Sequence, residues 1–353
     1  MRSKCSKLYL RWMLALACFA LVIPAASANV SLFMEEPFGT FGAFNPTGHA
    51  AIYLSDVCAD RPTRLRACHP GEMGVVISRY HHIHGYDWIA IPLIPYLYAV
   101  DDLADKPDTI TPALEAKLRD DYRRRYLEGI APDSADGSMP SGEWIQLIGS
   151  SYDRQIYGFQ MDTTTEQDRV LIEKLNDSHN VSHFNLFYRN CADFSRSVLR
   201  TYYPDRIPRN SLADFGLTTP KHLARSLVKI GSRQPELGYQ AFQIPQVDGT
   251  TLRSHHIRGI AESLVRSKRY AVPLAILSPT TVATLIAAYV TTGRFSAPKH
   301  APTMAELSPS PVGVVLQDDS IAIELPTARP AIDTLACSEN EAAFDGAMPG
   351  GSH

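Results

Sequence analysis

The stretch that most constrains the fold is residues 185–203, which read NLFYRNCADFSRSVLRTYY. Its apolar residues recur at helical spacings of three and four and form one face: Phe194, Val198, Leu199 and Tyr202. Cys191 lies in the first turn of this predicted helix. A helix N-terminus presents unpaired N–H groups and a partial positive charge, which stabilise a thiolate. Cys191 is therefore a candidate nucleophile, and the alternative is a small buried apolar residue.

The N-terminus has the three parts of a secretory signal peptide. Basic residues precede an apolar run over residues 12–23, and Ala26-Ser27-Ala28 is a small-residue cleavage motif. We therefore expect cleavage before Asn29, loss of residues 1–28 and export, with a bacterial-type periplasm as the destination. The alternative is an uncleaved signal anchor.

Export determines how the six cysteines are interpreted. The two N-terminal cysteines leave with the signal peptide. Cys58 and Cys68 flank a polar segment, and in an oxidising compartment they can close a hairpin through a disulfide. Cys337 lies in an expected tail, which leaves Cys191 as the unpaired thiol of the folded part.

Charge and residue spacing exclude other classes of protein. The net charge of −3 and the pI of about 6.5 leave no basic excess for nucleic acid. No zinc-type CxxC or HExxH spacing occurs, and His81, His82 and His84 suit neither one helix face nor one strand face. We expect no metal and no cofactor. The hydrophobic content of 45% supports a sizeable core.

The rest of the chain predicts a mixture of helices and strands. Capping residues and apolar stripes indicate helices at 111–126, 165–176 and 220–230. Short apolar or β-branched runs indicate strands at 48–54, 74–80 and 157–162. Residues 30–45 combine aromatics with Gly and Pro and predict a loop that lines a cleft. The two prolines of residues 87–98 favour a loop or an edge strand, and residues 232–256 are polar and poor in strand signals.

These segments suggest four parts: a signal peptide at 1–28, a folded domain at 29–231, an extension at 232–295 and a disordered, Pro/Ala/Ser-rich tail at 296–353. Within the extension, residues 271–290 carry no charge, and twenty residues approach the length that spans a bilayer. Two prolines and three threonines weaken that interpretation. The segment is either a membrane span or an apolar segment packed in a core or against a partner.

A thiol nucleophile needs a base within hydrogen-bond reach, and the base needs a third group to orient it. His49 is the leading candidate, because it follows Gly48 at the start of a predicted strand. The small residues Ala50 and Ala51 leave room for a substrate and for a closely packed helix. The alternative is a surface or capping histidine.

The strand Gly-His-Ala-Ala-Ile-Tyr-Leu at 48–54, followed much later by Asn-Cys-Ala-Asp-Phe at 190–194, resembles the circularly permuted NlpC-type papain-like proteins. These include the lecithin:retinol acyltransferase-like families and related bacterial periplasmic domains. The resemblance covers about residues 30–230. It implies an α+β fold in which a helix with Cys at its N-terminus packs against an antiparallel sheet that carries His. It also implies Cys191 as nucleophile, His49 as base and a third polar residue on the strand after the histidine.

For the third polar residue, the sequence does not match the family pattern clearly. His69 is the first candidate, Glu72 the second and Ser78 the third. The backbone N–H of Cys191 is the expected oxyanion donor, and Asn190 either assists it or only holds the turn.

We therefore expect an exported thiol hydrolase or acyltransferase that acts on an amide or ester bond. Its expected partner is a cell-envelope substrate, either a peptide or an acyl lipid. If 271–290 is a membrane span, the protein is also anchored to the membrane. The alternative is a catalytically inactive, membrane-associated binding or scaffolding module on the same fold.

Overall fold

The computed structural model describes residues 28–39, 46–81, 83–181, 184–298 and 300–307. These residues belong to one compact unit, Met1–Ser308. The predicted signal peptide, apart from Ala28, lies outside the described residues, as do His82 and residues 308–353 of the predicted tail.

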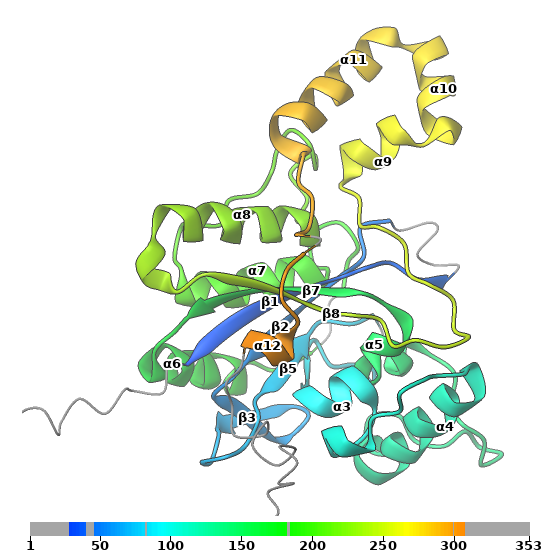
Figure 1. Cartoon of the computed structure of the whole chain (residues 1–353), viewed down its shortest axis with the longest axis vertical. Helices are drawn as coiled ribbons and strands as arrows, with labels where there is room; N and C mark the ends of the chain where they lie inside the picture. Colours follow the sequence, from blue (N-terminus) through cyan, green and yellow to red (C-terminus); the bar gives the residue numbers. More distant parts are fainter. Residues whose placement is uncertain (1–27, 40–45, 82, 182–183, 299, 308–353) are drawn as a thin grey trace, which may run out of the picture. The chain divides into compact units, whose positions relative to one another are not determined.

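A six-stranded antiparallel sheet organises the described residues, with the strand order β6-β5-β2-β1-β7-β8 (Figure 1). A separate hairpin, β3-β4, is inserted in the chain between β2 and β5. The strands are β1 (Asn29–Glu35), β2 (His49–Leu54), β3 (Val57–Arg61), β4 (Arg64–Ala67), β5 (Val75–Ser78), β6 (Ile89–Pro92), β7 (Ile156–Asp162) and β8 (Gln240–Ile244). The protein is thus a mixed α+β fold, as predicted.

Helices connect and cover these strands. The α-helices are α3 (Leu93–Tyr98), α4 (Pro112–Tyr122), α5 (Ser150–Asp153), α6 (Thr165–Asn176), α7 (Cys191–Tyr202), α8 (Pro220–Arg233), α9 (Ile260–Arg266), α10 (Lys268–Leu277), α11 (Pro279–Ala288) and α12 (Met304–Leu307). Short 3₁₀ helices lie at Leu103–Asp105, Glu143–Leu147 and Pro235–Leu237, and π-helical turns lie at Arg123–Leu127 and Tyr289–Gly293.

The sheet is buried on both faces because its side chains alternate between two apolar clusters. Ile52 and Leu54 of β2 pack with residues of α6, α7 and α8. Ala51 and Tyr53 point to the other side and pack with residues of α3, α4 and α5. This arrangement assigns α7, and therefore Cys191, to one face of the sheet.

The predicted helices begin where their capping residues indicated. Thr164 and Gln167 form a capping box at the start of α6, and Thr111 accepts the N–H of Leu114 at the start of α4. The predicted apolar face of α7 is buried, including Phe194 and Leu199. These helices follow from local sequence alone.

Two strand predictions are wrong. Residues 30–45 were predicted as a loop, but Asn29–Glu35 forms β1 in the middle of the sheet, between β2 and β7. A strand that is covered on both faces lacks the alternation of apolar and polar residues that identifies a strand. The prediction of a loop therefore followed from the Gly and Pro residues that come after β1. Residues 232–256 contain β8, which pairs with β7 and buries Phe242 and Ile244. The sheet therefore continues past residue 231.

The predicted disulfide is confirmed: Cys58 of β3 is bonded to Cys68, just after β4. Cys191 is the free cysteine among the described residues. The hairpin is also tied to α6, because the Asn176 side chain bonds the backbone N–H and C=O of Leu65.

The uncharged segment 271–290 is divided between α10 and α11, which meet at Ser278. Over the described residues, no helix combines the length and the apolar character needed to cross a membrane. The start of the predicted disordered tail is ordered, because Thr303 bridges to Gln243 of β8 and α12 follows it.

Candidate functional site

Cys191 is the first residue of α7, and a capping box fixes its position. The Asn190 side chain accepts the N–H of Asp193, and the Asp193 carboxylate accepts the N–H of Asn190. Asp193 is itself held by Arg209 at 2.7 Å and by the Thr218 hydroxyl at 2.6 Å. The start of the helix is thus tied down by side chains from the following loop.

The amide group of Asn190 is used in the same turn. Its nitrogen donates to the carbonyl of Leu186 at 3.0 Å and to that of Thr218 at 3.4 Å. With its oxygen engaged by Asp193, the side chain holds the turn. The contacts therefore support only the turn-holding alternative for Asn190.

The Cys191 thiol lies against the start of β2. Backbone N–H groups of Ala50 and Ala192 donate toward its sulfur. Burial nevertheless raises the pKa of the thiol to about 11, because these donors do not offset the loss of hydration. In the resting structure Cys191 is a neutral thiol at neutral pH.

His49, the first residue of β2, is held by two residues from the end of β5. Its ring stacks on Tyr80, with centroids 5.0 Å apart and planes 24° apart. Its Nε2 lies 2.9 Å from the Ser78 hydroxyl, which donates its proton to the carbonyl of Ala50 at 2.8 Å. A hydroxyl has one proton, so Ser78 accepts from Nε2–H. This network assigns the tautomer that leaves the lone pair on Nδ1.

Gly48 determines the backbone conformation directly before β2. Its φ is +71°, in the left-handed region that favours glycine, and an added Cβ would lie 2.1 Å from the backbone oxygen of Glu35. Only glycine therefore lets His49 sit opposite Glu35 in the β1–β2 register.

Cys191 and His49 lie at the same strand end, because the positive charge of Arg154, after the larger effect of burial, lowers the pKa of both groups. Cys191 also packs against the apolar cluster that contains Ala50. The β5 strand pairs with β2 only from Ile52 onward. The backbone of Ala50 is therefore free to receive the thiol through its N–H and Ser78 through its C=O.

The imidazole of His49 is also neutral at rest. Burial lowers its pKa to about 3, and the positive charge of Arg154 adds to that effect. With the thiol pKa at about 11, the pair does not rest as a thiolate and an imidazolium. Any proton transfer between them must occur as a reaction proceeds.

A buried polar cluster lies on the same face as His49, and the sequence analysis did not predict it. Glu35 is fully buried and accepts bonds from the Tyr96 hydroxyl and from Arg154, the latter at 3.0 Å. Burial raises the pKa of Glu35 even though Arg154 opposes that shift. Arg154 lies over the Phe38 ring at 4.3 Å. The missed signal was an acidic residue, Glu35, directly after the mostly apolar segment 30–34.

The structure places the other candidate third residues elsewhere. His69 is exposed, and its backbone N–H donates to Glu72, which pairs with Arg66 at 2.6 Å. These residues follow the β3-β4 hairpin, which leaves β2 at Leu54. The strand length from His49 to Leu54 corresponds to roughly 17 Å. Ser78 is therefore the candidate that contacts His49.

Ser78→Ala is expected to slow acylation of Cys191 without changing substrate binding. The variant loses one neutral hydrogen bond, worth ~1 kcal/mol, so we expect a fall of about fivefold in the acylation rate constant. Stopped-flow acylation over a range of ester concentrations separates the rate constant from the binding constant. His69→Ala is the matched control and should keep the parent rate. A loss with His69→Ala and none with Ser78→Ala would reverse the assignment.

Comparison of the chain with family models, with curated proteins and with solved structures gives no match. The fold and the site therefore define a mixed α+β protein with a cysteine at a helix N-terminus, whose thiol lies at the backbone N–H of the residue that follows a strand histidine.

Proposed function

We propose that this chain is an exported thiol hydrolase or acyltransferase with a circularly permuted papain-like fold, acting on an amide or ester bond of a cell-envelope substrate. The observation that carries the proposal is the convergence on Ala50. The Cys191 thiol lies at its N–H, and the Ser78 hydroxyl that accepts from His49 lies at its C=O.

In this mechanism, Nδ1 of His49 takes the proton from the Cys191 sulfur as the sulfur attacks the carbonyl carbon. The oxyanion accepts hydrogen bonds from backbone N–H groups at the start of α7. Nδ1–H then protonates the leaving amine or alcohol, and a thioester remains on Cys191. Water or a second acceptor, deprotonated by His49, releases the acyl group and restores the thiol.

The test is direct capture of the thioester on the full chain. A short p-nitrophenyl ester, a long-chain ester and a peptide amide are each incubated with the protein in a Cys337→Ser background, and the adduct is located by peptide mass spectrometry. We expect a hydroxylamine-sensitive acyl group on Cys191 with at least one of them, and none in Cys191→Ala. No adduct with any of the three counts against the proposal.

The second candidate is an inactive binding module, and the neutral resting pair favours it. A thiol with a pKa of about 11 and an imidazole with a pKa of about 3 are both neutral at pH 7, and a neutral thiol is a poor nucleophile. Under this alternative, the thioester never forms, and His49 has a structural role through its stacking on Tyr80 and its hydrogen bond to Ser78.

The pH dependence of alkylation tests the neutral pair itself. Iodoacetamide reacts with the thiolate, and a thiol of pKa about 11 is roughly one part in 10⁴ thiolate at pH 7. Because deprotonation increases with pH, the rate at Cys191 should rise about tenfold per pH unit from pH 6 to 9. Peptide-resolved mass spectrometry follows the modification. A plateau below pH 7 would instead indicate a preformed ion pair.

A further inference from the structure

The helices α9, α10 and α11 form a small unit that follows β8 (Figure 1). Their facing side chains form a small apolar cluster, in which Leu285 of α11 packs with Ala261 of α9, with Leu274 of α10 and with Ala213 from the segment between α7 and α8. The turn between α10 and α11 lies at Ser278.

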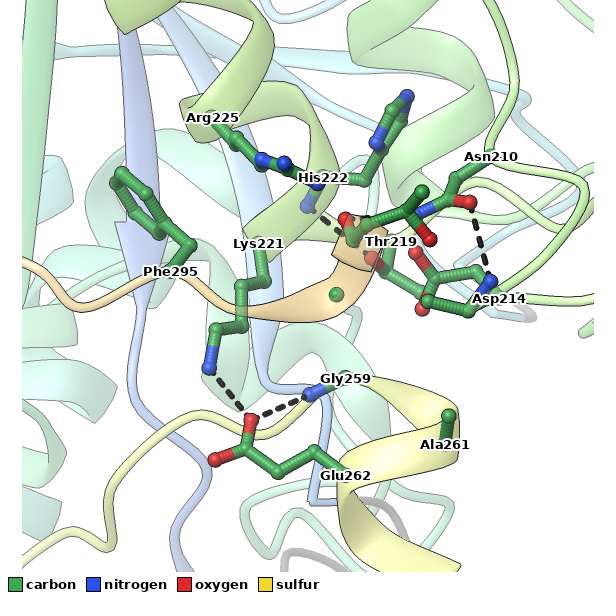
Figure 2. A pocket seen from close by; sticks show the side chains of 13 residues that line it. Asn210, Asp214, Thr219, Lys221, His222, Arg225, Gly259, Ala261, Glu262 and Phe295 are labelled. Carbon is green, nitrogen blue, oxygen red and sulfur yellow. Dashed lines mark hydrogen bonds and ion pairs between the residues drawn. The ribbon is translucent and has the colours of Figure 1, made fainter. Parts of the chain in front are cut away.

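Buried polar contacts fix the base of this unit to α8. Figure 2 shows a pocket at that junction, in which Glu262 bonds Lys221 at 2.5 Å and the backbone N–H of Gly259. The side chains of Lys221 and Glu262 are at most 9% exposed. Asn210 donates to the carbonyl of Thr292, just beyond α11. Lys221 and Glu262 line this pocket and are paired with each other, and their bond joins α9 to α8.

The outer surface of α10 and α11 is apolar and uncovered. Ile276 and Leu277, next to the turn, are 77% and 82% exposed, and four further large apolar residues are exposed on the same helices and the π-helical turn after α11: Tyr270, Val272, Ile286 and Val290. Such a concentration of exposed apolar side chains marks an interaction surface.

Charge is distributed asymmetrically along the unit. No Asp or Glu occurs from Ser263 to Ala305. The exposed cations Lys268 and Arg269 begin α10, and Arg294 follows the last turn after α11, so positive charge lies at the ends away from Ser278. The apolar residues at the α10–α11 turn match the apolar interior of a lipid membrane. The cations at the opposite ends of the two helices match its anionic headgroups.

The dimensions also match one leaflet. Each ten-residue helix is ~15 Å long at ~1.5 Å per residue. That length is about half of the ~30 Å hydrocarbon thickness of a bilayer. We propose that the α10–α11 turn inserts into one leaflet of an anionic phospholipid membrane, with Lys268, Arg269 and Arg294 at the headgroups. This inference does not depend on the thiol chemistry.

The test uses the full chain with vesicles of neutral phosphatidylcholine, with and without anionic phosphatidylglycerol. An environment-sensitive NBD label is attached at Leu277→Cys, in a background in which Cys5, Cys18, Cys191 and Cys337 are Ser. We expect the emission to rise and shift to the blue with anionic vesicles. The same label at Leu252→Cys is the matched control, because Leu252 is also 80% exposed but lies outside the unit; its emission should not change.

Two variants separate insertion from other occupants of the surface. Ile276→Asp with Leu277→Asp should reduce co-sedimentation with anionic vesicles at least tenfold, and Lys268→Glu with Arg269→Glu should reduce it about tenfold. Both sites are exposed, and circular dichroism checks that the fold is kept. Parent-level sedimentation of the aspartate variant overturns the proposal. So does a dimer without lipid that the aspartate variant abolishes, which would assign the surface to a second copy of the chain.

Discussion

His49→Gln is expected to slow acylation of Cys191 by about 10²–10⁴-fold, the usual contribution of a general base. Glutamine keeps a polar side chain at the strand start, but it offers no basic nitrogen at the position of Nδ1. Because the thiol has a pKa of about 11, it depends on that base more than an ordinary cysteine would. Burst kinetics with the ester that acylates the parent protein provides the rate.

The control for this variant is His222→Gln. His222 is another partly buried histidine with a pKa lowered chiefly by burial, and it bonds the carbonyl of Pro208, in a different part of the fold. It should acylate at the parent rate. Acylation of His49→Gln within threefold of the parent would contradict a base at this position and would leave the binding module as the better interpretation.

Arg154→Ala is expected to destabilise the fold by about 3–5 kcal/mol, the cost of breaking a buried ion pair. The side chains of Arg154 and Glu35 are 4% and 0% exposed. Removing the guanidinium leaves the Glu35 carboxyl with Tyr96 but without its cation. Urea unfolding at pH 7, followed by tryptophan fluorescence, measures the free energy of unfolding.

Arg253→Ala is the matched control for this prediction. Arg253 pairs with Asp248, but those side chains are 57% and 81% exposed, so the change should cost less than ~1 kcal/mol. Glu35→Gln combined with Arg154→Met should recover part of the loss, because it removes both charges together. Equal costs for Arg154→Ala and Arg253→Ala would refute the buried pair.

The parts of the site that local sequence specifies were predictable. Cys191 at a helix start follows from the capping residue Asn190 and the apolar spacing after it, and the structure has both. The disulfide follows from two cysteines that flank a polar turn. These features depend on residues within one helix or one hairpin.

The third residue was not predictable in the same way, because it depends on strand order. After β2 the next strands in the chain are β3 and β4, and His69 follows them. In the sheet, however, β2 lies between β1 and β5, and the last residue of β5, Ser78, contacts His49. Sequence order favoured His69 because a hairpin insertion cannot be distinguished from a continuing sheet by its residues.

The buried cluster around Glu35 was missed for a related reason. β1 is central and covered on both faces, so its residues carry no alternation that would identify it as a strand. Its partner Arg154 lies far along the chain, at the end of α5. A charge pair between such distant segments can be seen only once the sheet is assembled.

The Cys58–Cys68 bond has a consequence for the order of oxidation during folding. Its sequence separation is 10, so the unfolded chain closes this loop quickly and at low entropic cost. Cys191 lies more than a hundred positions away, and its burial requires β2 and α7 to meet first. In an oxidising compartment the short loop is therefore expected to close before a longer loop to Cys191 can, which leaves Cys191 reduced when β2 and α7 meet.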